Sequence, residues 1–213
     1  MTLRQEHDAL ASGIAETKEG ELYSGGHSWG YAYVDKNGEL QIHKEVGTIP
    51  ETVDIPVTDN ALVHTRLTTR GKINYTNAHP MRIADNNDNV VAAMAHNGTW
   101  QQSPQHDWFS DTWHMARIME LNYIQTGDFE KAFIETADQC SETIVALTAN
   151  GVGYVYAGRF SIYQEDSIFQ STNCDKLVRS GHVKRIDTDG NVELVDTNVG
   201  NPYSRFRRIK IRK

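Results

Sequence analysis

Cysteine is scarce in this 213-residue sequence, which contains only Cys140 and Cys174. The two residues form no Cys-X-X-Cys pair, so the sequence indicates no disulfide framework, and we expect a reducing, cytoplasmic compartment. The sequence also lacks any apolar run near the roughly 18 residues that a membrane-spanning helix requires. Its first ten residues, MTLRQEHDAL, lack the apolar segment of a signal peptide. We therefore expect no membrane partner.

Basic residues are outnumbered, with 21 lysines and arginines against 28 aspartates and glutamates and a formal net charge of −7. This balance argues against non-specific binding of nucleic acid by the body of the protein. Residues 205–213, RFRRIKIRK, are the exception, because six of them are basic. That tail either contacts phosphates or an acidic partner, or forms an edge strand whose charges discourage aggregation. We favour the edge strand.

Motifs for metals and nucleotides are missing as well. Nine histidines are present, but none belongs to a His-Glu-X-X-His motif or to a paired histidine–carboxylate spacing. The sequence contains neither a Gly-X-Gly-X-X-Gly motif nor a P-loop. We therefore expect no metal and no cofactor.

Helical periodicity predicts three helices, over residues 2–18, about 112–124 and about 128–147. Thr2-Leu3-Arg4-Gln5 fits a capping box for the first helix. Ser110-Asp111 is expected to cap the second. The stretch Thr126-Gly127-Asp128 is expected to end the second helix and to cap the third.

Strands are predicted where apolar and β-branched runs lie between turn signals, over residues 31–35, 39–46, 61–65, 90–95, 153–164, 166–173 and 183–196, the last as a hairpin turning at Asp189-Gly190. Asn37-Gly38 supplies the positive φ that a tight hairpin turn needs. Residues 66–88 are polar and are predicted to form a long loop. The order of helix, strands, two helices and strands predicts an α+β fold with mainly antiparallel sheet. The simplest reading is a single domain over residues 1–213, with 174–213 as a C-terminal hairpin and basic tail extension.

Four polar clusters carry candidate chemistry, and they are His64–Gly71 (HTRLTTRG), Asn77–Pro80 (NAHP), His96-Asn97-Gly98 and Ser110-Asp111-Thr112. The guanidinium of Arg66 suits bidentate capture of a carboxylate. The Asn97 amide and the Gly98 N–H can converge on one oxygen, as stabilisation of an oxyanion requires. Asp111 can hold an ammonium group. Taken one at a time, the clusters also fit structural roles: an ion pair for Arg66, turns for the second and third clusters, and a helix cap for the fourth.

The order of these clusters is more specific than any one of them. HTRxxTxG, then NAHP, then an apolar strand ending in His-Asn-Gly, then Ser-Asp-Thr opening a helix resembles the glutaminase domain of class II glutamine amidotransferases. Ser28-Trp29-Gly30 and the later stretch GRFSIYQEDSIFQSTN extend the resemblance over roughly residues 8–173.

The resemblance implies an N-terminal-nucleophile hydrolase fold, a four-layer αββα sandwich of two mainly antiparallel sheets. It also implies hydrolysis of glutamine to glutamate, with ammonia passed to an acceptor. No second, synthetase-type domain follows in the sequence, so the expected partners are glutamine or a similar amino acid and a separate synthetase or acceptor chain.

Matched positions imply roles for individual residues. Arg66 would bind the α-carboxylate of glutamine, with Thr69 lining that pocket, and Asp111 would bind the α-ammonium group. Asn97 and Gly98 would form the oxyanion hole. The supporting residues would be Asn77, His79 and His96.

The sequence departs from the family at the nucleophile, which is a cysteine opening the first strand, with its free α-amine as the base. Here residue 2 is Thr2, and no Cys-Gly-Ile strand follows. Thr2 is the one N-terminal candidate, although its predicted place is a helix cap. Leu67 and Arg70 replace a tryptophan and a histidine of the family, and residues 24–28 lack its acidic residue.

Two hypotheses follow. In the first, the protein is a glutaminase-type amidotransferase whose nucleophilic strand lies upstream of this start or on a separate segment. An in-frame Met-Cys-Gly in the preceding coding DNA would reveal an upstream strand. In the second, it is a catalytically inactive relative that acts as a binding or scaffolding module.

Overall fold

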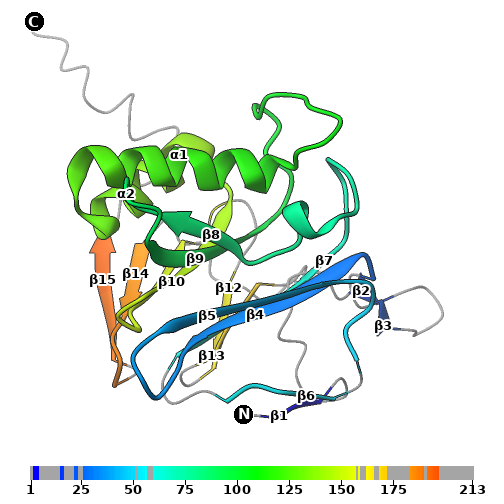
Figure 1. Ribbon diagram of the computed structural model, residues 1–213, viewed down its shortest axis with the longest axis horizontal. Coiled ribbons are helices and arrows are strands. Elements are labelled where there is room, and N and C mark those ends of the chain that lie inside the picture. The colour runs from blue at the N-terminus through cyan, green and yellow to red at the C-terminus, as the bar shows by residue number, and fades with distance from the viewer. Residues whose placement is uncertain are drawn as a thin grey trace, which may run out of the picture.

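The computed structural model describes residues 2–4, 15–16, 22–23, 26–50, 52–56, 60–156, 158, 162–165, 168–171, 183–189 and 191–196. The protein has the predicted α+β class, with two antiparallel sheets stacked on each other and two helices covering the outer face of the larger sheet (Figure 1). The larger sheet is formed, in spatial order, by β15 (Val192–Asp196), β14 (Val183–Ile186), β11 (Gly153–Tyr156), β10 (Thr143–Thr148), β9 (Val90–Asn97) and β8 (Met81–Ala84).

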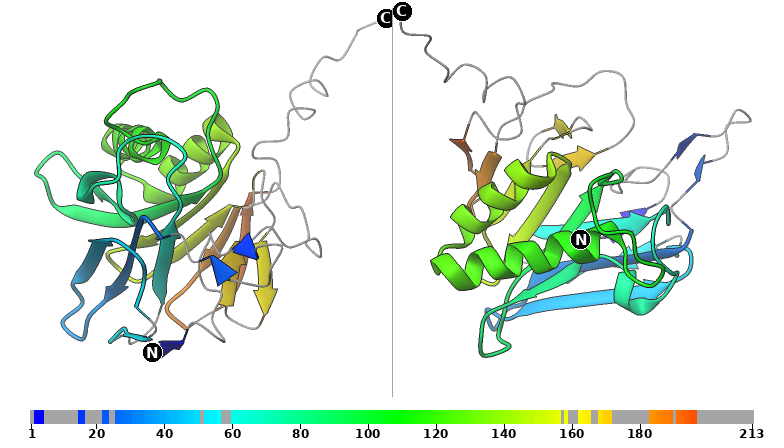
Figure 2. Two further views of the ribbon diagram at one scale, coloured as in Figure 1. Left: turned by 90° about the vertical axis from the view of Figure 1, so that its right-hand side faces the viewer. Right: turned by 90° about the horizontal axis from the view of Figure 1, so that it is seen from above.

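The smaller sheet consists of β5 (Leu40–Val46), β4 (Ser28–Val34) and β7 (Ala61–Arg66), in that order. Three further antiparallel pairs are β1 (Thr2–Arg4) with β6 (Thr52–Asp54), β2 (Ala15–Glu16) with β3 (Leu22–Tyr23), and β12 (Ile162–Glu165) with β13 (Ile168–Ser171). The helices α1 (Asp111–Thr126) and α2 (Phe129–Cys140) lie side by side on the larger sheet, as Figure 2 shows from above.

The sandwich has one core on each side of the larger sheet. The first, here called the helix-side core, contains Met115 and Phe133 of the helices together with Met94 of β9. The second, here called the inter-sheet core, contains Ala32, Leu62, Ala93, Ala95 and Leu147. Three of its five buried residues are alanines, so the two sheets approach closely, and packed interiors of this kind respond to the addition of even one methylene group.

Local signals explain the helix ends. Ser110 caps α1 by accepting a hydrogen bond from the Trp113 N–H at 3.1 Å, and Gly127 ends the helix with φ of 66°. Asp128 caps α2, as predicted. The prediction that this helix extends to 147 is wrong, because α2 ends at Cys140 and residues Thr143–Thr148 form β10. Strand β10 lies between β9 and β11, so apolar residues at helical spacing serve a buried strand instead.

The predicted helix over residues 2–18 is also wrong where the structure describes it. Thr2–Arg4 forms β1, paired with β6, and Ala15–Glu16 forms β2. The other residues of that range lie outside the described part of the chain. Within the described residues the architecture has three layers, one of helices and two of sheet, rather than the four that the resemblance implies. The outer face of the smaller sheet carries a cluster of Trp29, Val53 and Ile55.

The region 66–88, predicted as one loop, contains regular structure. It includes a short 3-10 helix, η1 (Tyr75–Asn77), and the edge strand β8, which pairs with β9. Strand β8 has only four residues and lies in a segment rich in asparagine, so its apolar residues did not stand out in the sequence. The predicted hairpins at β4–β5 and β14–β15 are confirmed. The prediction of one strand over residues 153–164 is wrong, because Gly153–Tyr156 forms β11 in the larger sheet and Ile162–Glu165 forms β12, which pairs with β13.

The β14–β15 hairpin joins the larger sheet through β11, so it is an integral edge of that sheet rather than an appended extension. Cys174 and the basic tail at 205–213 lie outside the described residues. Neither of the two described helices is long and apolar enough to cross a membrane.

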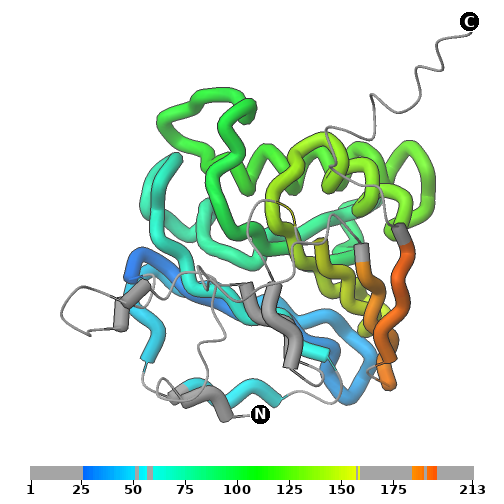
Figure 3. The backbone as a smooth tube through the Cα atoms, turned by 180° about the vertical axis from the view of Figure 1, so that it is seen from behind, coloured from blue at the N-terminus to red at the C-terminus, as the bar shows by residue number. Residues whose placement is uncertain are grey.

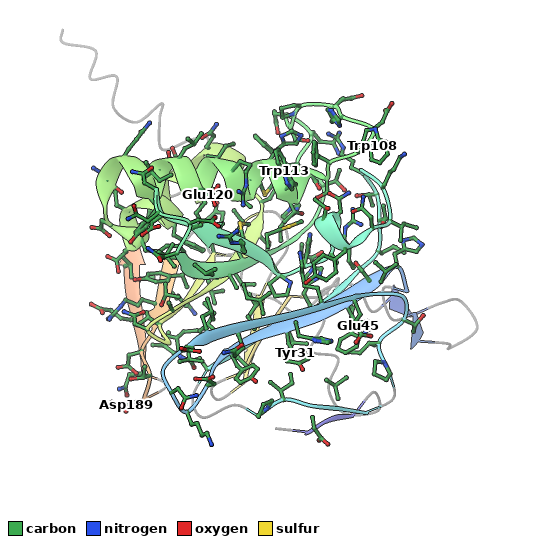
Figure 4. The ribbon with its side chains drawn as sticks, in the orientation of Figure 1. Tyr31, Glu45, Trp108, Trp113, Glu120 and Asp189 are labelled. Carbon is green, nitrogen blue, oxygen red and sulfur yellow. The ribbon has the colours of Figure 1, made fainter. Side chains whose placement is uncertain are left out.

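Three hairpins close with the same turn chemistry. In each, an aspartate accepts backbone N–H bonds from the residues two and four positions later, and the aspartates are Asp35, Asp85 and Asp187. Hydrogen bonds from these neighbours lower the pKa of all three carboxyl groups. Asp189, in one of the turns, lies at the opposite end of the molecule from Trp108 (Figure 4).

We predict that Ala93→Leu lowers the free energy of unfolding by about 1–3 kcal/mol, because Ala93 is fully buried in the inter-sheet core and a larger side chain would force the sheets apart. Urea denaturation measures the change. Glu135→Leu, which adds the same side chain at an exposed position of α2, should stay within ~0.5 kcal/mol of the parent protein. Equal stability of the two variants would contradict close packing of the sheets.

Candidate functional site

The candidate site lies where β7 and β9 end on facing sides of the sandwich. Alternate residues of a strand point to the same face, so Arg66 and Asn97 share the faces of their strands with residues of the inter-sheet core. Thr69 and Thr99, just beyond the two strand ends, are joined through their hydroxyl groups at 3.0 Å. The two strands therefore deliver a guanidinium and an amide to the same end of the sandwich.

Arg66 is buried, with 5% of its surface exposed, and it is held by its own loop. Nη1 donates to Thr68 Oγ1 at 2.7 Å and Nη2 donates to the Arg70 carbonyl at 2.6 Å. Burial lowers the pKa of Arg66, and the negative charge of Asp111 acts in the opposite direction. A guanidinium remains protonated at neutral pH, so a positive charge stands at this end of the sandwich.

Asp111 opens helix α1 and is equally buried, at 5% exposed. Its Oδ2 accepts the Trp100 N–H at 2.8 Å, and its Oδ1 accepts the Thr112 N–H at 3.0 Å. The helix N-terminus favours a negative charge at this position. Of the ion pairs that join described side chains, none links Asp111 with Arg66. The two charges are held near each other by separate backbone contacts.

Asn97 is the last residue of β9, and Gly98 follows it. Gly98 has φ of 128°, a conformation that residues with a side chain rarely adopt. The turn therefore requires glycine at the position that the sequence assigned to an oxyanion hole. Trp100 packs in the helix-side core, and its backbone N–H donates to Asp111. One short turn thus links the end of β9 to the carboxylate.

Asn77 joins the two loops beside the site, which are residues 67–80 after β7 and residues 98–110 after β9. Its Nδ2 donates to the carbonyls of Lys72 and Trp108 at 2.9 and 2.6 Å, and its Oδ1 accepts the Ser110 N–H at 2.9 Å. Gly71 contributes on the same side, since a Cβ there would come within 2.7 Å of the backbone at Ser110. Both loops rise on the same side of the molecule (Figure 3), and Asn77 fixes one against the other.

Arg70 makes contacts that were not predicted from the sequence. Its guanidinium donates to Ser103 Oγ at 2.8 Å and to Gln101 Oε1 at 3.2 Å. It therefore ties the loop after β7 to the loop after β9. In the same loop, Leu67 is 53% exposed, and Thr69 is also exposed. In the sequence Arg70 stands out only as a departure from the family that the sequence resembles, and nothing there predicts its contacts with the second loop.

Three buried histidines, His64, His79 and His96, form a chain of polar contacts next to the site, here called the histidine thread. His64 Nε2 donates to the His96 carbonyl at 3.1 Å. His79 Nδ1 lies 3.2 Å from each ring nitrogen of His64, so the two imidazoles are in direct contact. His96 Nδ1 lies 3.1 Å from Thr112 Oγ1. The thread thus ties β7 and the 78–80 loop to the end of β9.

Burial keeps these imidazoles neutral. Desolvation lowers the pKa of His64 to about 3 and that of His96 to about 4. Desolvation, followed by the positive charge that His64 would carry, lowers the pKa of His79 well below its ordinary value. These histidines therefore act as hydrogen-bonding groups, and none is poised to exchange a proton near neutral pH.

Neither Cys140 nor Thr2 lies at this site. Cys140 is buried at the end of α2, in the helix-side core, and burial raises the pKa of its thiol to about 12. Thr2 lies in β1, opposite Asp54, rather than at a helix cap. In Figure 1, β1 lies at the bottom of the molecule, whereas α1 runs along the top.

No group of three or more histidine, cysteine, aspartate or glutamate side chains comes together as a metal site within the described part of the chain. No protein-family model matches the sequence, and no curated protein matches it.

We predict that stability falls as the pH drops below about 6.5. A histidine whose pKa is lower in the folded protein than in the unfolded chain favours unfolding as protons become available. The loss begins near pH 6.5 and continues toward the folded values of about 3 for His64 and about 4 for His96. Each such histidine contributes a slope of ~1.4 kcal/mol per pH unit in this window. Urea denaturation between pH 7 and 5 measures the slope.

Two variants sharpen the test. His64→Leu should remove one histidine's share of the slope, whereas His106→Leu, at an exposed loop position, should leave the slope unchanged. A free energy of unfolding that stays constant from pH 7 to 5 would contradict the buried, neutral thread.

Proposed function

We propose that the protein binds L-glutamine or a closely related α-amino acid in the manner of a class II amidotransferase glutaminase domain. The observation that carries the proposal is the pair of buried, opposite charges at Arg66 and Asp111, each held by backbone contacts and not joined to the other. The finer assignment to the N-terminal-nucleophile hydrolase fold is part of the same proposal. The stacked antiparallel sheets support it.

A free α-amino acid carries a carboxylate and an ammonium group at a fixed separation. Arg66 offers a cation that suits a carboxylate, and Asp111 offers an anion that suits an ammonium group. Both charges lie at low exposure, where water competes poorly for them. A ligand that lacks either charge would leave one buried ion without a partner, so the pair selects zwitterions.

The amide of a bound glutamine side chain would then reach the end of β9. There the Gly98 N–H and the Asn97 amide group are the donors for the oxygen that becomes negative during hydrolysis. Released ammonia would pass to a separate synthetase or acceptor chain. Asn77 and the histidine thread hold the strand end and the loops in place and take no part in the chemistry.

A second candidate function is amino-acid binding without turnover. It is favoured by the positions of Cys140, buried in a core, and Thr2, in the β1–β6 pair. In this case the protein acts as a binding or scaffolding module that retains the amino-acid-binding residues of the family that its sequence resembles. The two candidates share the binding step and differ in the hydrolytic step.

We predict that L-glutamine binds the full chain in isothermal titration calorimetry, and that Arg66→Met and Asp111→Asn each weaken binding at least tenfold. A hydrogen bond to a charged group contributes ~1.5–3 kcal/mol, and ~1.4 kcal/mol is a factor of ten. Arg82→Met and Asp189→Asn remove the same charges at exposed positions and should leave the affinity unchanged. Binding that survives both site substitutions would refute the proposal.

Ammonia release separates the two candidates. If the protein is a glutaminase, glutamine-dependent ammonia release should fall ~100-fold in Asn97→Ala, because one oxyanion donor is lost. Binding of L-glutamine with no ammonia release, in a protein whose N-terminus has been verified by mass spectrometry, would identify the binding module.

A further inference from the structure

Ser28, the first residue of β4, has a buried hydroxyl group with no partner. Its side chain is 1% exposed, and its Oγ makes no hydrogen bond in the part of the chain that the structure describes. Buried polar groups in folded proteins are nearly always hydrogen-bonded, because an unpaired one carries its full desolvation cost. Such a group is therefore a marker for a missing bonding partner.

The register of the smaller sheet places this hydroxyl beside Arg66. Ser28 is directly opposite Arg66 in the β4–β7 pairing, and residues that face each other across an antiparallel pair extend to the same side. Ala32, four positions further along β4, is in the inter-sheet core. Ser28 therefore faces the larger sheet, at the same end of the sandwich as Asn97.

The surrounding groups leave the hydroxyl unpaired while their own bonds are made. The Arg66 guanidinium donates to Thr68 and to Arg70, and the Thr68 N–H donates to His27 Nδ1 at 2.8 Å. A hydroxyl next to a buried guanidinium is suited to an anion, since the hydroxyl donates one bond while the cation supplies the charge.

We propose that Ser28 is a substrate-binding residue whose hydroxyl donates a hydrogen bond to the α-carboxylate bound by Arg66. This inference rests on the proposed function, because it assigns a second contact to the same carboxylate. It adds to the site a residue for which the sequence indicated no role in binding.

Thr65 provides a matched control within the same sheet. Its Oγ1 is also buried and makes no hydrogen bond among the described residues, but Thr65 is opposite Trp29 in the β4–β7 pairing. It therefore faces the outer side of the smaller sheet, away from Arg66. Removal of this hydroxyl tests burial alone, without the carboxylate.

The experiment compares Ser28→Ala and Thr65→Val with the parent chain by isothermal titration calorimetry against L-glutamine and L-glutamate, with a thermal melt of each protein. Ser28→Ala should raise Kd about tenfold for both ligands. Its melting temperature should not fall, because no hydrogen bond of the unliganded protein is lost. Thr65→Val should leave both Kd values unchanged.

The outcomes separate the two proposals. Parent-like affinity in Ser28→Ala overturns the role of Ser28 and leaves the proposed function intact. Equal weakening in both variants, or a lower melting temperature in Ser28→Ala, assigns the hydroxyl to the fold and also overturns the inference. If the parent chain binds neither amino acid, the proposed function fails and the inference fails with it.

Discussion

The site depends on one constraint, which is that two buried charges of opposite sign are kept from neutralising each other. Arg66 is held by the loop that follows β7, and Asp111 is held by the turn that follows β9 and by the first turn of α1. A direct ion pair would satisfy both charges and leave nothing for a ligand. In the proposed function, each charge is satisfied only in part by the groups that hold it, and a ligand that carries both signs supplies the remaining contacts.

The sandwich explains how these groups meet. Alternation along β4, β7 and β9 directs Ser28, Arg66 and Asn97 toward the gap between the sheets, and the small inter-sheet core lets the strands lie close. Beyond the strand ends, Asn77 and Arg70 bind neighbouring loops to each other. The polar groups are thus positioned by strands, and the loops are fixed by buried or bridging side chains. Such preorganisation reduces the cost of ordering a site when a ligand binds.

Local signals predicted local structure well. The Asn-Gly and Asp-Gly turns, the Ser110 cap and the Gly127 stop depend on the conformations of a few residues, and all were readable from the sequence. The errors arose where distant contacts decide: β10 has apolar residues at helical spacing but lies between two strands, and Thr2–Arg4 pairs with β6 although it resembles a capped helix start. The charged and amide groups of the site were predicted by their order. The proposed role of Ser28 and the loop-bridging contacts of Arg70 were not predicted, because a missing partner or a bridge between loops is visible only in three dimensions.

The most direct test of the two separated charges is a crystal structure of the protein with L-glutamate. The account predicts that the α-carboxylate lies within hydrogen-bond distance of the Arg66 guanidinium and that the α-ammonium group lies within hydrogen-bond distance of Asp111. L-Glutamate bound at any other place, or Arg66 and Asp111 joined directly to each other in the crystal, would contradict it.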